Sequence, residues 1–83
     1  MSLIIVYRKD SESATAAESF LRDYHDQTGR EIEVRSPDDA SGQQFIEMYD
    51  IVSYPTLIAL GPDGTELAKW RDNLPTIDEV SIY

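Results

Sequence analysis

Few side chains in this sequence of 83 residues could carry out chemistry. There is no cysteine, which excludes disulfides, thiolate catalysis, iron–sulfur clusters and zinc–thiolate sites. The single histidine, His25, cannot by itself build a metal site or a Ser/His/Asp triad. A group of hydroxyls remains at Ser11, Ser13 and Thr15, close behind two basic residues. We predict no catalytic residue, no metal site and no cofactor.

The charge balance narrows the classes of partner. Sixteen acidic residues against seven basic ones give a formal net charge of −9 at pH 7. This charge repels phosphate backbones and anionic lipids, so we expect neither nucleic-acid nor membrane binding. The longest apolar run, Leu3–Tyr7, is too short for a signal peptide or a membrane span. Because small secreted domains often need disulfides, the lack of cysteine favours a cytoplasmic location.

The first half of the chain predicts two strands separated by a helix. Leu3–Tyr7 is continuously apolar and rich in β-branched residues, which is typical of a strand buried on both faces. Ser13–Thr28 contains neither Gly nor Pro and carries apolar residues at helical spacing, and Gly29 supplies a left-handed stop. Glu31–Arg35 alternates with period two, which predicts a half-buried strand.

A second helix is predicted over Ala40–Tyr49. Asp38 and Asp39 precede it, where carboxylates stabilise the first amides of a helix, so both are interpreted as caps. A calcium loop needs alternating oxygen ligands over about twelve residues, and that pattern is absent. Within the helix, the apolar residues Phe45, Met48 and Tyr49 share one face, with Ile46 beside it.

The last third predicts a hairpin and a short helix. Gly61–Gly64 is a tight-turn signal between the strands Thr56–Leu60 and Glu66–Arg71. Thr76 and Glu79 are spaced as a capping box for a short terminal helix. The order is β-α-β-α-β-β-(α) in a single α/β domain, residues 1–83. We expect a four-stranded mixed sheet in which the first two strands are parallel and the last two antiparallel.

This order, with a proline at the start of the third strand, resembles the thioredoxin fold in its small, glutaredoxin-like form. The segment Ile51–Ile58 looks like the family's passage from a Tyr-containing helix end through Ile or Val to Pro-Thr and a hydrophobic strand. Val34–Asp38, the turn Gly61–Gly64 and the strand around Trp70 also occupy the family's positions.

The family's Cys-x-x-Cys motif lies at the N-terminus of the first helix. Counting along the chain places it on Ser11–Ala14 or, shifted by one, on Glu12–Thr15. Ala14 precedes Pro55 by 41 positions, a spacing typical of thioredoxins, which supports the first alternative. Neither alternative contains a thiol, so dithiol–disulfide exchange is impossible.

The resemblance also implies a binding surface. It identifies Pro55 as the family's cis-proline and the backbone of Tyr54 as a partner for an extended peptide or a glutathione-like ligand. The alternative is that Tyr54 and Pro55 only shape the start of the strand. Arg8 and Lys9 are expected to tune its charge preference, or else to form a solvated strand end. The residues assigned to this surface are Ser11, Glu12, Ser13, Ala14, Ser53, Tyr54 and Pro55.

The hydroxyls of this surface have two interpretations. Ser11, Ser13 and Thr15 could bind an anion or hold a glutathione thiol. Alternatively, Ser11 or Ser13 simply caps the first amides of the helix, which is what serine ordinarily does there.

Three functions are compatible with these residues. The favoured one is a redox-inactive, thioredoxin-like binding or adaptor module for a protein or an extended peptide. A second is a cysteine-independent, glutathione-binding enzyme of transferase type, with Ser11 or Tyr7 as the activating hydroxyl. A third is a structural homodimer or subunit, because the apolar tail Val80–Tyr83 is shorter than the family's usual final helix and could leave part of the sheet exposed.

Overall fold

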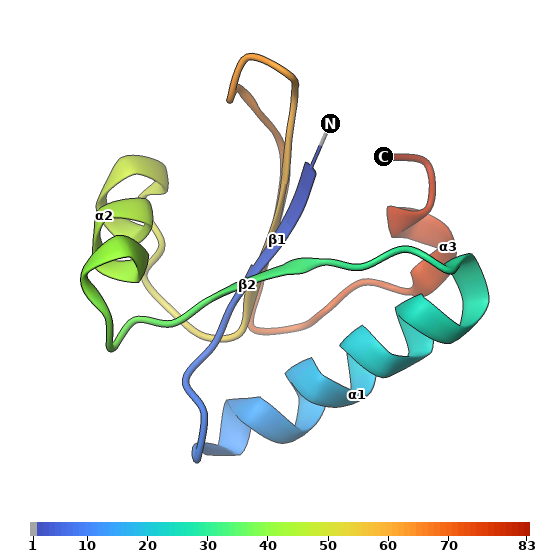
Figure 1. Ribbon diagram of the computed structural model, residues 1–83, viewed down its shortest axis with the longest axis horizontal. Helices are drawn as coiled ribbons and strands as arrows, with labels where there is room; N and C mark the ends of the chain where they lie inside the picture. Colours follow the sequence, from blue (N-terminus) through green and yellow to red (C-terminus); the bar gives the residue numbers. More distant parts are fainter. Residues whose placement is uncertain (1) are drawn as a thin grey trace.

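The computed structural model describes residues 2–83, which form four strands and three helices (Figure 1). The chain alternates between strands and helices and then closes with a hairpin and a single helical turn. In chain order the elements are β1 (Ser2–Val6), α1 (Glu12–Thr28), β2 (Glu33–Arg35), α2 (Ala40–Tyr49), β3 (Thr56–Leu60), β4 (Glu66–Arg71) and α3 (Ile77–Val80).

The four strands form one mixed sheet in the order β2-β1-β3-β4. β1 runs parallel to β2 and antiparallel to β3, and β3 runs antiparallel to β4. α2 covers one face of this sheet, while α1 and α3 cover the other (Figure 1). The predicted topology is therefore confirmed. No helix within residues 2–83 has the length and apolar character to cross a membrane, and the cytoplasmic location stays a prediction.

The core is divided unequally between the two faces. The central strands β1 and β3 are buried on both sides, as their continuous apolar runs predict. The buried residues on the α1 face are Leu3, Ile5, Tyr7, Ala14, Ala17, Phe20, Tyr24, Ile32, Leu57, Ala59 and Val80. The buried cluster on the α2 face consists of Ile4, Ile58 and Leu60, against which Phe45 and Tyr49 pack.

The helix ends follow the sequence signals in most places. Gly29 adopts the left-handed conformation, with φ of 72°, and its N–H donates to His25 O at 2.8 Å. The carboxylate of Asp39 accepts a hydrogen bond from Gly42 N at 2.7 Å and so caps α2. Thr76 Oγ1 accepts one from Glu79 N at 3.2 Å and caps α3.

Two strand predictions need correction. The first strand begins at Ser2 and ends at Val6, one residue earlier at each end than predicted. The second strand is only Glu33–Arg35, because just these three residues pair with β1. Ile32 is still buried, but Val34 is exposed because β2 lies at the edge of the sheet.

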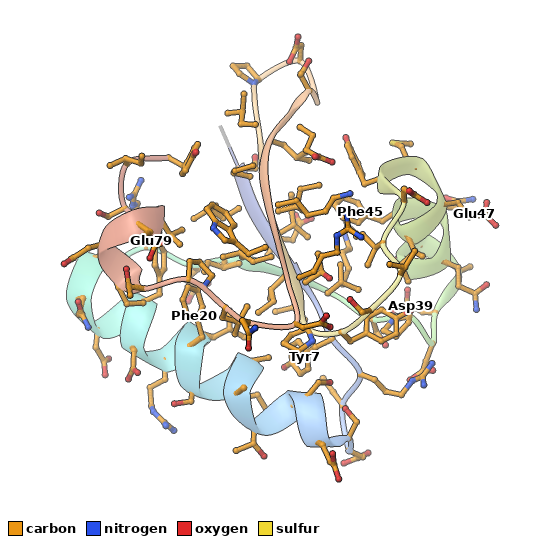
Figure 2. All side chains as sticks on the ribbon, turned by 180° about the vertical axis from the view of Figure 1, so that it is seen from behind. Tyr7, Phe20, Asp39, Phe45, Glu47 and Glu79 are labelled. Atoms are coloured by element: carbon orange, nitrogen blue, oxygen red, sulfur yellow. The ribbon has the colours of Figure 1, made fainter. Side chains whose placement is uncertain are left out.

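The predicted apolar face of the second helix is also partly wrong. Met48 is 72% exposed, whereas Phe45 and Tyr49 pack onto the sheet. The inward face follows Phe45 and Tyr49 at i, i+4, which turns Met48 toward solvent. Figure 2 shows Phe45 pointing from α2 toward the sheet and Glu47 pointing away from it.

Candidate functional site

The end of β1 and the start of β3 lie side by side because Val6 pairs with Thr56. This pairing places Tyr54 and Pro55, which directly precede β3, at the end of the sheet from which the chain leads into α1. The peptide bond between Tyr54 and Pro55 is cis. The N–H of Asp72 donates a hydrogen bond to Pro55 O at 3.0 Å, which ties this loop to the end of β4.

The residues before Pro55 carry polar groups that the fold does not use. Ser53 O accepts a hydrogen bond from Thr56 Oγ1 at 2.7 Å, but the buried Ser53 Oγ has no partner within residues 2–83. Tyr54 is half-buried. Among the hydrogen bonds of the described chain, none uses the backbone N–H or C=O of Tyr54. A donor and an acceptor of the main chain are therefore available at Tyr54.

Arg8 links three segments at this edge. Its guanidinium carbon lies 5.8 Å from the centroid of the Tyr54 ring, a cation–π contact. Its Nε donates to Asp38 Oδ1 at 3.1 Å, which joins the loop after β1 to the loop before α2. The prediction that Asp38 caps α2 is therefore corrected, because Asp39 is the cap and Asp38 pairs with Arg8. Lys9 is exposed and has no ion pair within residues 2–83.

The start of α1 differs from the predicted cap. Ser11 occupies the N-cap position, but its hydroxyl donates to Arg8 O at 2.5 Å and lies 2.7 Å from Ser13 Oγ. Its side chain therefore makes no capping hydrogen bond, and Ser13 supplies none either. The Ala14 N–H reaches Ser11 O at 3.1 Å, and the amides of Glu12 and Ser13 have no partner in the described chain.

Arg8 is the residue that connects the two halves of the predicted surface. Its carbonyl contacts Ser11 and its side chain contacts Tyr54, although the sequence assigned it only a role in charge preference. Ala14, by contrast, is buried in the core, and its side chain is not available to a ligand. Glu12 is exposed at the rim. The sequence signal for the Arg8–Asp38 pair was the parallel arrangement of β1 and β2, whose carboxyl ends meet at one edge.

Tyr7 is the other hydroxyl at this edge. Figure 2 shows it above the first turns of α1, and its hydroxyl donates to Glu18 Oε2 at 3.3 Å. Burial raises the pKa of the Tyr7 phenol, and the charge of Glu18 and this hydrogen bond raise the pKa further. A phenol that holds its proton more tightly is poorly suited to activate a nucleophile at neutral pH.

Metal ligands do not gather in the described part of the chain. No group of three or more His, Asp or Glu side chains within residues 2–83 is placed to hold a metal ion. His25 is exposed near the end of α1, with Nδ1 at 3.9 Å from Asp26 Oδ1.

Comparison with known proteins gives no match to a family model and none to a curated protein. Among solved structures, the chain is similar to thioredoxin 1 from Thermosipho africanus, with 18% identity and a TM-score of 0.69 over 96% of this chain and 85% of that one. It is also similar to thioredoxin-2, a component of the malaria parasite protein secretion machinery, with 18% identity and a TM-score of 0.68 over 98% and 80% of the two chains.

A designed protein is similar at 24% identity, with a TM-score of 0.61 over 98% of this chain and 69% of the other. At these identities the likeness concerns the fold. The fold of this chain is thioredoxin-like, and because the sequence has no cysteine, the Cys-x-x-Cys motif is absent from it.

Proposed function

We propose that this chain is a redox-inactive, thioredoxin-like domain that binds an extended segment of a partner protein without a covalent step. One observation carries the proposal: the backbone N–H and C=O of Tyr54 have no partner within residues 2–83, at the edge where β1, α1 and β3 meet. Thiol–disulfide exchange is excluded because it requires a thiolate, and the sequence has none.

The proposed mechanism is main-chain pairing. An extended peptide that passes Tyr54 accepts a hydrogen bond from its N–H and donates one to its C=O. Arg8 holds the Tyr54 ring in place while Asp38 neutralises part of its charge, and Lys9 remains free to meet an acidic side chain of the peptide. Two hydrogen bonds contribute only about 1–3 kcal/mol in water, so we expect weak binding unless apolar peptide side chains add to it.

The test is an amide NMR titration of the 15N-labelled chain with a mixed pool of extended peptides. We expect shifts concentrated at Ser53–Thr56 and Ser11–Thr15. Arg8→Ala removes the contact to the Tyr54 ring and should weaken binding about two- to fivefold. Lys9→Ala removes an equal charge but no contact with the Tyr54 ring, so it should weaken the binding only of peptides that carry an acidic side chain. If millimolar peptide moves neither the Tyr54 nor the Thr56 amide, the proposal is wrong.

The same titration with glutathione tests the enzyme alternative. The unpaired amides of Glu12 and Ser13 would favour an anion or a thiolate at the start of α1. Shifts with glutathione alone, together with turnover of an electrophile, would replace the adaptor proposal by the transferase one. Sedimentation at several concentrations tests the structural homodimer.

A further inference from the structure

A cavity of about 250 Å³, partly open to solvent, lies where β1 begins, at the opposite end of the sheet from Tyr54, and its lining residues Arg30 and Glu31 are exposed. Its volume corresponds to roughly eight molecules of liquid water, which suits a small metabolite better than a drug-sized ligand. The residues around it come from β1, α1, the segment that joins α1 to β2, and the tail after α3. Its polar lining consists of Ser2, Tyr24, Arg30, Glu31, Glu33 and Tyr83.

Tyr24 has a hydroxyl group at the cavity that makes no hydrogen bond within the described chain. It lies on the inner face of α1 and is only 2% exposed. No hydrogen bond of its hydroxyl is found within residues 2–83, and the hydroxyl is not sealed off from solvent. The Tyr24 hydroxyl therefore faces the cavity as a donor that no acceptor of the described chain occupies.

Arg30 provides the second donor group. Its guanidinium carbon lies 5.8 Å from the centroid of the Tyr24 ring, and no carboxylate within residues 2–83 lies within ion-pair distance of it. The left-handed Gly29 ends α1 just before Arg30 and so turns the chain toward β2. A guanidinium over the Tyr24 ring and the phenol hydroxyl of the same residue can each donate a hydrogen bond to a carboxylate.

The carboxylates that line the cavity determine which positively charged groups it can bind. Glu33 Oε2 is already held by Arg35 Nη2 at 2.7 Å, whereas Glu31 has no cation within ion-pair distance in the described chain. A simple anion would be repelled by Glu31 and Glu33 and by the net charge of −9. A simple cation would be repelled by Arg30. Only a ligand with both charges has a favourable partner for each of them.

We propose that this cavity binds a small zwitterion of the free α-amino acid type. The ligand carboxylate accepts hydrogen bonds from Arg30 and from the Tyr24 hydroxyl, and its ammonium group faces Glu31. Arg30 and Glu31 both line the pocket, so it offers one group of each sign. This site lies away from the Tyr54 surface and does not depend on peptide binding.

The test is an amide NMR titration of the full 15N-labelled chain with glycine, L-serine and L-leucine, each at about 10 mM, well above a millimolar Kd. Two matched probes each lack one charge of leucine: 4-methylpentanoate lacks the ammonium group and 3-methylbutylamine lacks the carboxylate. We expect at least one amino acid to shift the amides of Ser2, Arg30 and Glu31. Both truncated probes should shift them at least about tenfold less.

Three variants separate this site from a general charge effect. Arg30→Gln should weaken amino-acid binding at least about tenfold, because it removes the charged partner of the carboxylate. Tyr24→Phe should weaken it about three- to tenfold and leave the urea midpoint unchanged, because the hydroxyl makes no hydrogen bond within the protein. Arg22→Gln, an exposed cation on α1 outside the cavity, should change neither.

Several results would overturn the proposal. One is the absence of shifts at Ser2, Arg30 and Glu31 with all three amino acids. Another is an equal response to 4-methylpentanoate, which would indicate an adventitious anion. A third is unchanged binding in Arg30→Gln. None of these results bears on the peptide proposal, which is read at the amides of Tyr54 and Thr56.

Discussion

The two faces of the sheet are covered by helices that are attached in different ways. The α1 face is held by burial, since eleven buried residues form one apolar cluster; they come from β1 and the residue after it, α1, the segment before β2, β3 and α3. On the α2 face the buried cluster has three residues, and specific polar contacts add to it. Tyr49 Oη donates to Gly64 O at 2.8 Å, and Lys69 Nζ donates to Tyr49 O at 2.6 Å.

This difference implies different responses to damage. Apolar burial is spread over many atoms, so the α1 face should lose stability in proportion to the volume removed. Attachment of α2 depends on a few contacts of defined geometry, so single atoms matter more there. We expect α2 to open at a lower free energy than α1, as a separate local event.

The largest expected effect is at the adjacent core residues Leu57 and Ile58, which point to opposite faces and are fully buried. Leu57→Ala should lower the free energy of unfolding by about 4 kcal/mol and Ile58→Ala by about 2–3 kcal/mol, because fewer apolar neighbours surround Ile58. Urea unfolding of both variants measures the two values. An equal or reversed order would remove the distinction between the faces.

Next in size is Gly42→Ala in α2. A Cβ atom at this position would lie 1.6 Å from the backbone oxygen of Ser36, so α2 must move away from the preceding loop. We expect a loss of about 2 kcal/mol even though alanine favours helix by about 1 kcal/mol over glycine. Gln44→Ala, at an exposed position of the same helix, is the control and should be nearly neutral.

Hydrogen exchange would show which helix the Gly42→Ala substitution destabilises. In Gly42→Ala the amides of α2 should exchange faster, whereas those of α1 should change less. Equal acceleration in α1 and α2 would mean that the two faces open together rather than as separate units.

Most of the fold is readable in the sequence because its signals are local. The apolar run at the start of the chain, the Gly29 stop and the turn at Gly61–Gly64 each depend on neighbouring residues only. The errors arose where distant contacts decide the outcome. Val34 fits the alternation of a half-buried strand, but it is exposed because its strand lies at the sheet edge. Met48 is exposed because Tyr49, which hydrogen-bonds to the β3–β4 turn, packs against the sheet instead.

The candidate site was less predictable for the same reason. The sequence identified Tyr54 and Pro55 through a family resemblance, but only the folded chain brings Arg8 onto the Tyr54 ring and next to Asp38. The cavity at the start of β1 carried no sequence signal at all. Tyr24 shows the same helical spacing whether or not its hydroxyl finds a partner, and that depends on the packing of α1 against the start of β1.

The N-terminus of α2 is stabilised by a specific capping hydrogen bond, whereas that of α1 has none. The two sheet faces that these helices cover differ in the same way. Asp39→Ala should destabilise the protein by about 1 kcal/mol, because the carboxylate caps α2 through Gly42 N. Ser11→Ala should cost only a few tenths of a kcal/mol, because the Ser11 hydroxyl makes no capping hydrogen bond and α1 is held by burial. Thermal or urea unfolding of both variants measures the difference. A loss at Ser11 as large as that at Asp39 would contradict the observed cap geometry.

The smallest effect concerns Tyr7, a polar contact on the face that otherwise depends on burial. Burial, and then the charge of Glu18, raise the Tyr7 pKa in the folded protein, while the unfolded chain releases this proton near pH 10. Above pH 10 the unfolded state therefore holds fewer protons than the folded state, so the stability from this group is complete below pH 10 and falls as the pH rises through the folded pKa.

Urea unfolding from about pH 9 to 11 should show that decline, and Tyr7→Phe should make it shallower. If Tyr7→Phe left the slope at its wild-type value, folding would not raise the pKa of Tyr7, and the expected effect of its burial and of Glu18 would be wrong.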